Sequence, residues 1–148
     1  QRSRTRSLTS DFVEPFEFHA SLTQLDDALD TLHHSVQLLR DRVSGAVDDT
    51  NVMLFESALG EIGANVMTHG RKERPDDPPV EYTLRLEGHM ALATFTDRGP
   101  PLHNQLTRAM PEPTSEAGRG LAIARQVLDE LGYEREGEVN TWRLVKRL

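Results

Sequence analysis

Two long amphipathic stretches follow each other in the first half of the chain, and they limit the fold more than any other feature. In the first, from Ser21 to about Ser44, apolar residues recur at spacings of three and four, with Ser21 as the expected N-cap and Gly45 as the end. The second starts near Asp48 and stops at Gly70. Each spacing places one apolar stripe on a helix. Both stripes need an apolar surface to cover, so we expect a layered domain.

The remaining pattern supplies a sheet and one more helix. A third helix is expected from about Leu121 to Leu131, with Gly132 closing it. Helices and strands do not alternate regularly, which predicts an α+β fold: a two-layer α/β sandwich, with a mostly antiparallel mixed sheet and helices on one face. Short alternating stretches predict strands at 12–18, 80–86, 90–95, 133–136 and 141–145.

Length and charge restrict the class of protein. The chain has 148 residues, a formal net charge of −7 and no cysteine. This length predicts one domain, which we place at residues 11–148 after a flexible basic tail at residues 1–10. The acidity argues against nucleic acid as a partner, and no stretch reaches the ~18 apolar residues of a membrane helix. Zero cysteines exclude disulfides and fit a cytoplasmic location.

A row of polar side chains lies beside the apolar stripe of the second helix. Glu61, Asn65 and His69 are four residues apart and so share one helical row. An amide oxygen is a hard ligand that suits magnesium, and a carboxylate can orient or deprotonate a hydroxyl group. The alternative is a solvated shoulder of an amphipathic helix with no chemical role.

Two further segments combine glycines with charged residues. Asp97 follows a predicted strand, where its carboxylate can accept a hydrogen bond from a base, and Gly99 lets the backbone approach a ligand. The alternative is that these residues form an ordinary turn with no ligand. Gly118, Arg119 and Gly120 stand at the head of the third helix, where free backbone N–H groups and an arginine fork suit phosphate. The alternative is a glycine-rich hinge.

The three segments together, in this order, resemble the ATP-binding domain of the histidine-kinase-like (GHKL, or Bergerat-type) ATPase family. EIGANVMTHG is similar to the family's N box, FTDRGPP to its first glycine box, and EAGRGLAIARQVLDELGY to its second. The ending NTWRLVKRL is similar to the last strand of the branch of anti-sigma factor serine kinases. The resemblance covers residues 12–148, nearly everything that should fold.

The resemblance implies ATP and Mg²⁺ as cofactors and a role for each matching residue. Asn65 would hold the metal, and Glu61 would act as general base on a serine hydroxyl. Asp97 would accept from the adenine amino group. The residues implied to bind the nucleotide are Asn65, Asp97, Gly99, Gly118, Arg119, Gly120 and Thr141.

The resemblance also implies a function and partners. We expect an anti-sigma factor with ATP-dependent serine kinase activity, which binds a sigma factor and phosphorylates an anti-anti-sigma (STAS-type) partner as a homodimer. Pro101 replaces the second glycine of the first box, and Leu102 and His103 stand in an expected lid, 99–118, where that branch often has an aromatic and an acid. The alternative is a non-catalytic nucleotide-binding or protein-interaction switch module, cut from a larger regulator at Gln1.

Overall fold

The computed structural model describes residues 15–69, 77–101 and 116–148. The expected basic tail and most of the expected lid lie outside these ranges, so both stay predictions. The elements in chain order are β1 (Phe16–Leu22), α2 (Leu25–Val43), α3 (Asp49–His69), β2 (Val80–Glu87), β3 (Met90–Asp97), α4 (Glu116–Val127), β4 (Glu130–Glu136) and β5 (Val139–Arg147).

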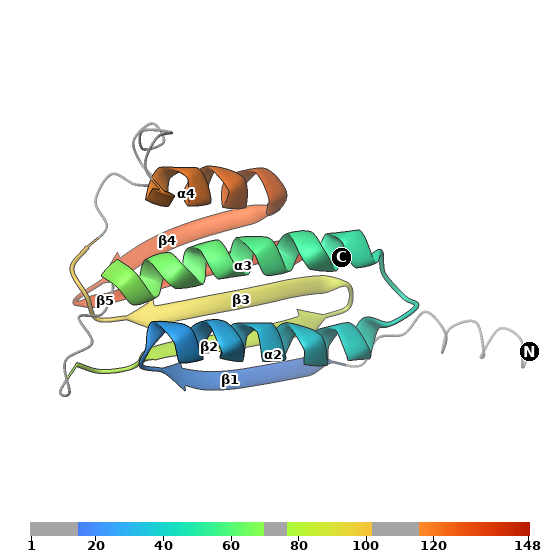
Figure 1. Ribbon diagram of the computed structural model, residues 1–148, viewed down its shortest axis with the longest axis horizontal. Helices are drawn as coiled ribbons and strands as arrows, with labels where there is room; N and C mark the ends of the chain where they lie inside the picture. The colour runs from blue at the N-terminus through green and yellow to red at the C-terminus, as the bar shows by residue number, and fades with distance from the viewer. Residues whose placement is uncertain (1–14, 70–76, 102–115) are drawn as a thin grey trace, which may run out of the picture.

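The five strands form one sheet in the order β1-β2-β3-β5-β4 (Figure 1). Every neighbouring pair is antiparallel, so the sheet is fully antiparallel where a mostly antiparallel one was expected. Both β3 and β4 are antiparallel to β5, which lies between them, and therefore run in the same direction. The connection through α4 thus crosses over β5.

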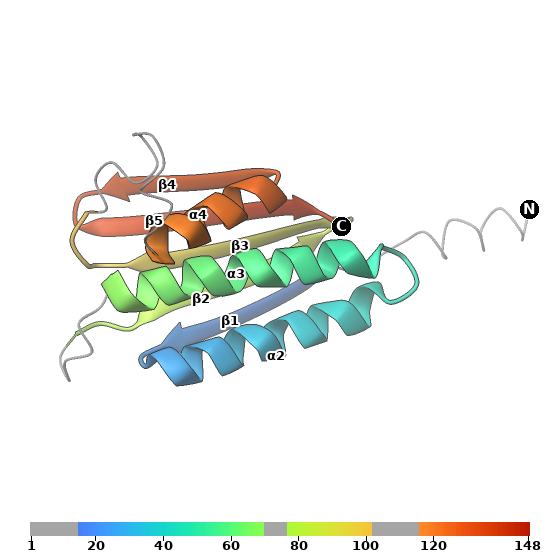
Figure 2. The same cartoon turned by 45° about the horizontal axis from the view of Figure 1, so that its top comes forward.

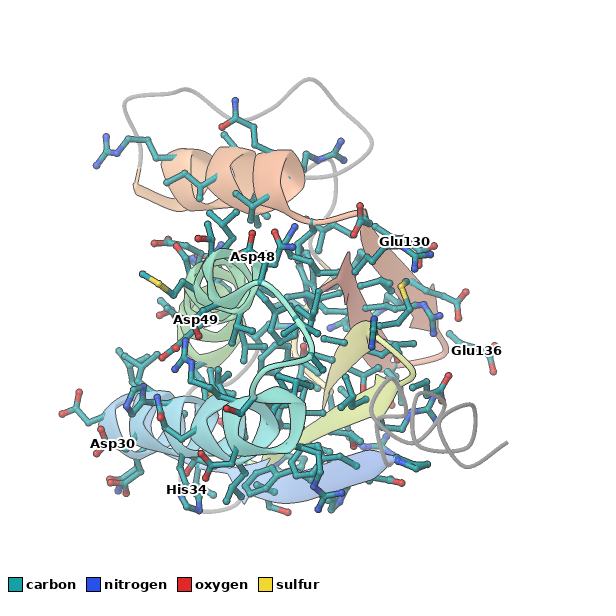
Figure 3. All side chains as sticks on the ribbon, turned by 90° about the vertical axis from the view of Figure 1, so that its right-hand side faces the viewer. Asp30, His34, Asp48, Asp49, Glu130 and Glu136 are labelled. Atoms are coloured by element: carbon teal, nitrogen blue, oxygen red, sulfur yellow. The ribbon has the colours of Figure 1, made fainter. Side chains whose placement is uncertain are left out.

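The three helices lie side by side on one face of the sheet (Figure 2). Seen from the end, helices and sheet form two layers, and Asp30 and His34 lie on the outside of α2 (Figure 3). Burial alternates along β3 from Met90 to Asp97, because successive side chains point toward and away from the helices. The predicted α+β two-layer sandwich is confirmed.

The core fills the space between the two layers. Its largest fully buried side chains include Phe55 of α3, Tyr82 of β2, Phe95 of β3 and Trp142 of β5. The helices approach the sheet closely at Gly63, where an added Cβ would lie 2.5 Å from a Leu32 methyl carbon and 3.4 Å from the Phe95 ring. A glycine at this position therefore sets the spacing of α3.

The start of the first helix differs from the prediction. Helix α2 begins at Leu25, after the extended residue Gln24, and Ser21 is not its N-cap. Instead Ser21 belongs to β1, pairs with Glu81 of β2 and donates a hydrogen bond to its carboxylate at 2.9 Å. The alternation that was read over residues 12–18 continues to Leu22 because pairing with β2 overrides the capping signal.

The end of the third helix also differs. Helix α4 ends at Val127, and Leu131 and Gly132 lie in β4. Leu131 is opposite Leu144 of β5, so its partly buried side chain packs against the core from the sheet, and not from the helix as its helical spacing had predicted. The other two ends agree with the sequence. Gly45 follows α2 with φ of +82°, a conformation that favours glycine, and Asp48 accepts a hydrogen bond from the Thr50 amide at the start of α3.

None of the helices in the described parts of the chain combines the length and the apolar character that crossing a membrane requires.

Candidate functional site

The predicted site residues other than Thr141 gather at one end of the sandwich. The C-terminal ends of α3 and β3 meet the N-terminal ends of α4 and β5 there (Figure 2). Helix α3 packs against α4, and it also contacts β3 and β5. Segments that are up to about eighty residues apart in the sequence are thereby brought together.

Asp97 is the buried acid of this end. Only 3% of it is exposed, and it faces the helical layer as the last residue of β3. The Gly99 amide and the Asn140 side-chain amide each donate to Oδ1 at 2.8 Å, while Oδ2 accepts no hydrogen bond from the described residues. Burial raises the pKa of this carboxyl group, and the two hydrogen bonds and nearby Arg135 oppose the rise. Asp97 thus keeps one oxygen for a donor from outside.

The hydrogen bond from the Gly99 amide to Asp97 bears on the alternative interpretation of this segment as an ordinary turn. A carboxylate that accepts from the amide two residues later is an Asx turn, so the segment is a turn as well as a buried acid. The two readings are compatible, because the turn fixes Oδ1 and leaves Oδ2 uncommitted.

Asn140 is the residue that sequence reasoning missed. It is 1% exposed, lies opposite Asp97 in the β3–β5 register, and donates to the Gly99 carbonyl at 3.0 Å as well as to Asp97. A signal was present in the alternation of the last strand. Asn140, Trp142 and Leu144 occupy alternate positions, so the apolar pair predicts that the amide also faces the core.

Glu61 reaches from α3 to the first turns of α4. Its carboxylate lies against Gly120, where an added Cβ would meet the Glu61 Oε1 atom. Glycine at position 120 is therefore what gives the carboxylate room between the two helices. The structure thus brings the polar row of α3 against the glycine segment of α4.

Asn65 lies one helical turn beyond Glu61 on the same row. Its Nδ2 atom is buried and finds no hydrogen-bond partner among the described residues. A buried amide without a hydrogen-bond partner costs about 1–3 kcal/mol of folding free energy, which a ligand that accepts its hydrogen bond could recover. The other described atom of this kind, Trp142 Nε1, lies in the core where its ring contacts Tyr133. His69, the third member of the row, is exposed at the end of α3.

The glycine segment lies inside α4 and not before it. Gly118 and Arg119 belong to the first turn of a helix that starts at Glu116, where the Gly118 amide is among those without an intrahelical acceptor. Gly120 is the fifth residue, and its role here is to admit Glu61. Arg119 is exposed.

Thr141 does not join the other residues. It is opposite Thr96 in the β3–β5 register, one position away from the Asp97 and Asn140 pair, so it lies on the face of the sheet away from the helices. The structure therefore offers Asn140 next to Asp97, and it leaves Thr141 on the other side.

The donor set fits the ATP and Mg²⁺ that the sequence resemblance implies. Among the residues that the structure describes, no three His, Asp or Glu side chains lie close enough to hold a metal by themselves. Magnesium in phosphate sites needs few protein ligands, because phosphate oxygens and water supply the rest. The Asn65 side chain offers an oxygen that suits Mg²⁺ and an unpartnered Nδ2 that can donate to a phosphate oxygen, while Asp97 Oδ2 can accept from a base.

Solved structures with a similar fold include one with RsbU and RsbW domains and two histidine kinases. The RsbU and RsbW domains of Rv1364c from Mycobacterium tuberculosis align with a TM-score of 0.64 and 19% identity, over 90% of this chain and 32% of that one. The histidine kinase domain of the EL346 blue-light activated kinase from Erythrobacter litoralis aligns at 0.54 and 17%, over 87% and 64%. The Acinetobacter baumannii histidine kinase AdeS aligns at 0.51 and 12%, over 98% and 74%.

These likenesses concern the fold, and the chain spans about a third of the length of the Rv1364c structure. No curated protein matches the sequence. Residues 20–146, however, match the family described as "Histidine kinase-like ATPase domain". That range includes the three helices, β2, β3 and β4, all of β5 but its last residue, the end of β1, and the whole candidate site. The chain therefore belongs to the family of histidine kinase-like ATPase domains.

Proposed function

We propose that this chain is an anti-sigma factor with ATP-dependent serine kinase activity, which binds a sigma factor and phosphorylates a STAS-type anti-anti-sigma partner. The observation that carries the proposal is the pair of uncommitted polar groups at one end of the sandwich, Asp97 Oδ2 and Asn65 Nδ2. Membership of the family supports nucleotide binding there. The similarity of fold to a structure that contains an RsbW domain, and Pro101 in the first glycine box, favour the anti-sigma branch.

Asp97 selects the base in this proposal. An ionised carboxylate only accepts hydrogen bonds, so Oδ2 would take one from the amino group of adenine. Guanine presents a carbonyl oxygen at the same place, which a carboxylate repels. Gly99, which already donates its amide to Asp97, leaves room beside the base because it has no side chain.

Asn65 and the start of α4 act on the phosphates. The amide oxygen of Asn65 is a hard ligand for Mg²⁺, and the amide of Gly118 and the guanidinium group of Arg119, both in the first turn of α4, are suited to phosphate oxygens. When bound, ATP supplies the phosphoryl group and Mg²⁺ neutralises charge on its oxygens.

Glu61 is the proposed general base. Its carboxylate lies between α3 and α4 beside Gly120, close to the end of α4 where the phosphates are expected. A carboxylate in this position would accept the proton of the serine hydroxyl as the hydroxyl attacks. Because Gly120 fixes the space around it, the carboxylate is oriented by the packing of two helices.

The proposal is tested by transfer of radiolabelled phosphate from ATP to candidate STAS proteins of the same genome. Glu61→Ala should keep Mg-ATP affinity within a few-fold and slow transfer by about 10²–10⁴. Glu56→Ala is the matched control, since this carboxylate of α3 faces α2 and accepts from His33. If Glu61→Ala transfers at the parent rate, Glu61 is not the base.

Asn65→Ala should behave differently and lose both Mg-dependent affinity and transfer, because Asn65 would hold the metal whose charge favours both nucleotide binding and phosphate transfer. Asn51→Ala, at the start of α3 and away from the site, is its control. A parent protein that binds Mg-ATP but transfers no phosphate to any candidate would favour the second function, a non-catalytic nucleotide-binding switch module. The replaced residues Leu102 and His103 are the sequence observation behind that second function.

The proposed role places the protein in the cytoplasm and pairs it as a homodimer. Sedimentation of the purified chain, alone and with the candidate sigma factor, would measure both assemblies. A chain that sediments as a monomer and binds none of the candidate sigma factors would contradict the anti-sigma role, but not the proposed nucleotide binding.

A further inference from the structure

The edge strand β4 reaches into the site through two side chains. The Tyr133 hydroxyl donates a hydrogen bond to Asn140 Oδ1 at 2.6 Å, and Arg135 Nη1 donates to the same atom at 2.8 Å. Neither residue contacts Asp97 by a hydrogen bond of its own. Both act on the residue that does.

These two bonds fix which way the Asn140 amide faces. An arginine side chain can only donate, so the group that it meets must be the amide oxygen. The amide nitrogen is then turned toward Asp97 Oδ1, at 2.8 Å, and toward the Gly99 carbonyl, at 3.0 Å, which both only accept. With the amide reversed, Oδ1 would face a carboxylate and a carbonyl, and Nδ2 would face a cation.

Arg135 holds a second group of the same end. Its Nη1 atom also donates to the Gly99 carbonyl at 3.0 Å, so one guanidinium group ties β4 to β5 and to the turn after β3. Its positive charge also favours the ionised form of Asp97, which burial disfavours. The Tyr133 ring packs on Trp142, with 5.0 Å between ring centroids, which holds its hydroxyl in place.

We propose that Tyr133 and Arg135 are positioning residues for base recognition: through Asn140 and the Gly99 carbonyl they hold Asp97 as an oriented, ionised acceptor. This inference rests on the proposed function, in which Asp97 reads the adenine amino group. It adds that specificity for the amino group is set from the edge strand of the sheet. The phosphate-binding residues do not depend on it.

The experiment compares two nucleotides that differ by one group. ATP and purine riboside 5′-triphosphate, which lacks the exocyclic amino group, are titrated with Mg²⁺ into the parent chain and its variants. Arg135→Met removes all donors and keeps an apolar stem, and Arg135→Lys restores the charge and a donor. Arg143→Met on β5 is the control, because Arg143 is exposed and pairs with Glu130. Tyr133→Phe removes one hydroxyl and keeps the ring on Trp142.

We expect the parent to prefer ATP by roughly tenfold, the contribution of one good hydrogen bond to a charged group. Arg135→Met should bring the preference close to one while the affinity for the analogue changes less than about threefold. Arg135→Lys should regain part of the preference, Tyr133→Phe should show an intermediate value, and Arg143→Met should match the parent.

Two results overturn the inference alone. One is an unchanged preference in Arg135→Met and Tyr133→Phe, and the other is an equal loss of affinity for both nucleotides, which would mean that β4 only supports the fold. A parent chain that binds neither nucleotide, or that binds both equally, overturns the proposed reading of Asp97 first and the inference with it.

Discussion

Two buried polar clusters, one at each half of the sheet, differ in a way that separates structure from function. Between α2 and β2, the Ser35 hydroxyl donates to the Leu32 carbonyl at 2.7 Å and bonds the Tyr82 hydroxyl at 2.8 Å. All of these groups are neutral. The Tyr82 ring stacks on Phe95, and burial raises the pKa of its hydroxyl well above the usual range, so this cluster stays neutral. The cluster is closed, because its hydroxyl groups form hydrogen bonds with one another and with the Leu32 carbonyl.

The second cluster, around Asp97 and Asn140, is charged and open. Both polar atoms of the Asn140 side chain form hydrogen bonds: Oδ1 accepts from Arg135, and Nδ2 donates to Asp97 Oδ1. Asp97 Oδ2, in contrast, accepts no hydrogen bond from the described residues. A buried carboxylate costs several kcal/mol unless partners compensate it. In the proposed function this uncommitted oxygen accepts the hydrogen bond of the base. The two clusters therefore differ in closure and not in burial: the first satisfies its own polar groups, and the second leaves one oxygen able to accept from a ligand.

The largest expected effect on stability comes from Asn140→Asp, which would place a second carboxylate beside Asp97 in the open cluster. The substitution replaces the donor at 2.8 Å from Asp97 by a second carboxylate oxygen. Loss of a buried partner together with like-charge repulsion should lower the free energy of unfolding by about 3 kcal/mol at neutral pH. Urea denaturation measures the change.

The pH dependence of that variant supplies the check. Two carboxylates at this distance share a proton, so the pKa of one of them is raised in the folded state. Stability should therefore return as the pH falls through this raised pKa. Equal stability losses at neutral and acidic pH would mean that the substitution acts through packing and not through charge.

A smaller effect is expected at the closed cluster. Ser35→Ala leaves the buried Tyr82 hydroxyl without its partner and should cost about 1–2 kcal/mol of unfolding free energy, with Mg-ATP affinity unchanged. Tyr82→Phe should cost less, because Ser35 keeps its bond to the Leu32 carbonyl. The double variant should cost less than the sum of the two. A loss of nucleotide affinity in Ser35→Ala would break the distinction between the clusters.

The smallest effect on stability is expected at Gly120, although its effect on catalysis is large. In Gly120→Ala the new methyl group displaces the flexible end of Glu61, while alanine improves helix propensity by about 1 kcal/mol. The net change in unfolding free energy should stay within about 1 kcal/mol, and phosphate transfer should fall by about 10². Gly60→Ala, with nothing within 4 Å of the added Cβ, should transfer like the parent. Normal transfer in Gly120→Ala would show that Glu61 need not lie there.

Much of this architecture could be read from the sequence because it follows from local periodicity. The stripe of α3, the hairpin of β2 and β3, and the row that carries Glu61 and Asn65 all depend on residues close together in the chain. The errors arose where two local signals competed. Ser21 is a good helix cap but also fits the alternation of β1, and only its pairing with Glu81 decides between them.

The interior of the site could not be read in the same way. Asn140 meets Asp97 because β5 inserts between β3 and β4, which is a consequence of sheet order and not of spacing. Tyr133 and Arg135 fall in the strand predicted at 133–136, but their role could not be predicted, since their contact with Asn140 depends on the register of β4 with β5. Contacts between strands that are set by register lie beyond what one sequence pattern predicts.

The most direct test of the account is calorimetric titration of Mg-ATP and Mg-GTP into the parent chain and Asp97→Asn. The asparagine keeps an acceptor at Oδ1 and removes a buried charge. Because the pKa of Asp97 is raised in the folded parent, the protonated carboxyl group stabilises the fold at low pH, and this contribution is lost as the pH rises through that pKa. Near neutral pH, Asp97→Asn should therefore be at least as stable as the parent. We expect the parent to bind ATP and to prefer it to GTP by roughly tenfold or more, and we expect Asp97→Asn, still folded, to lose this preference. Failure of the parent to bind Mg-ATP at millimolar concentration, or an unchanged preference in Asp97→Asn, would contradict the proposed role of Asp97.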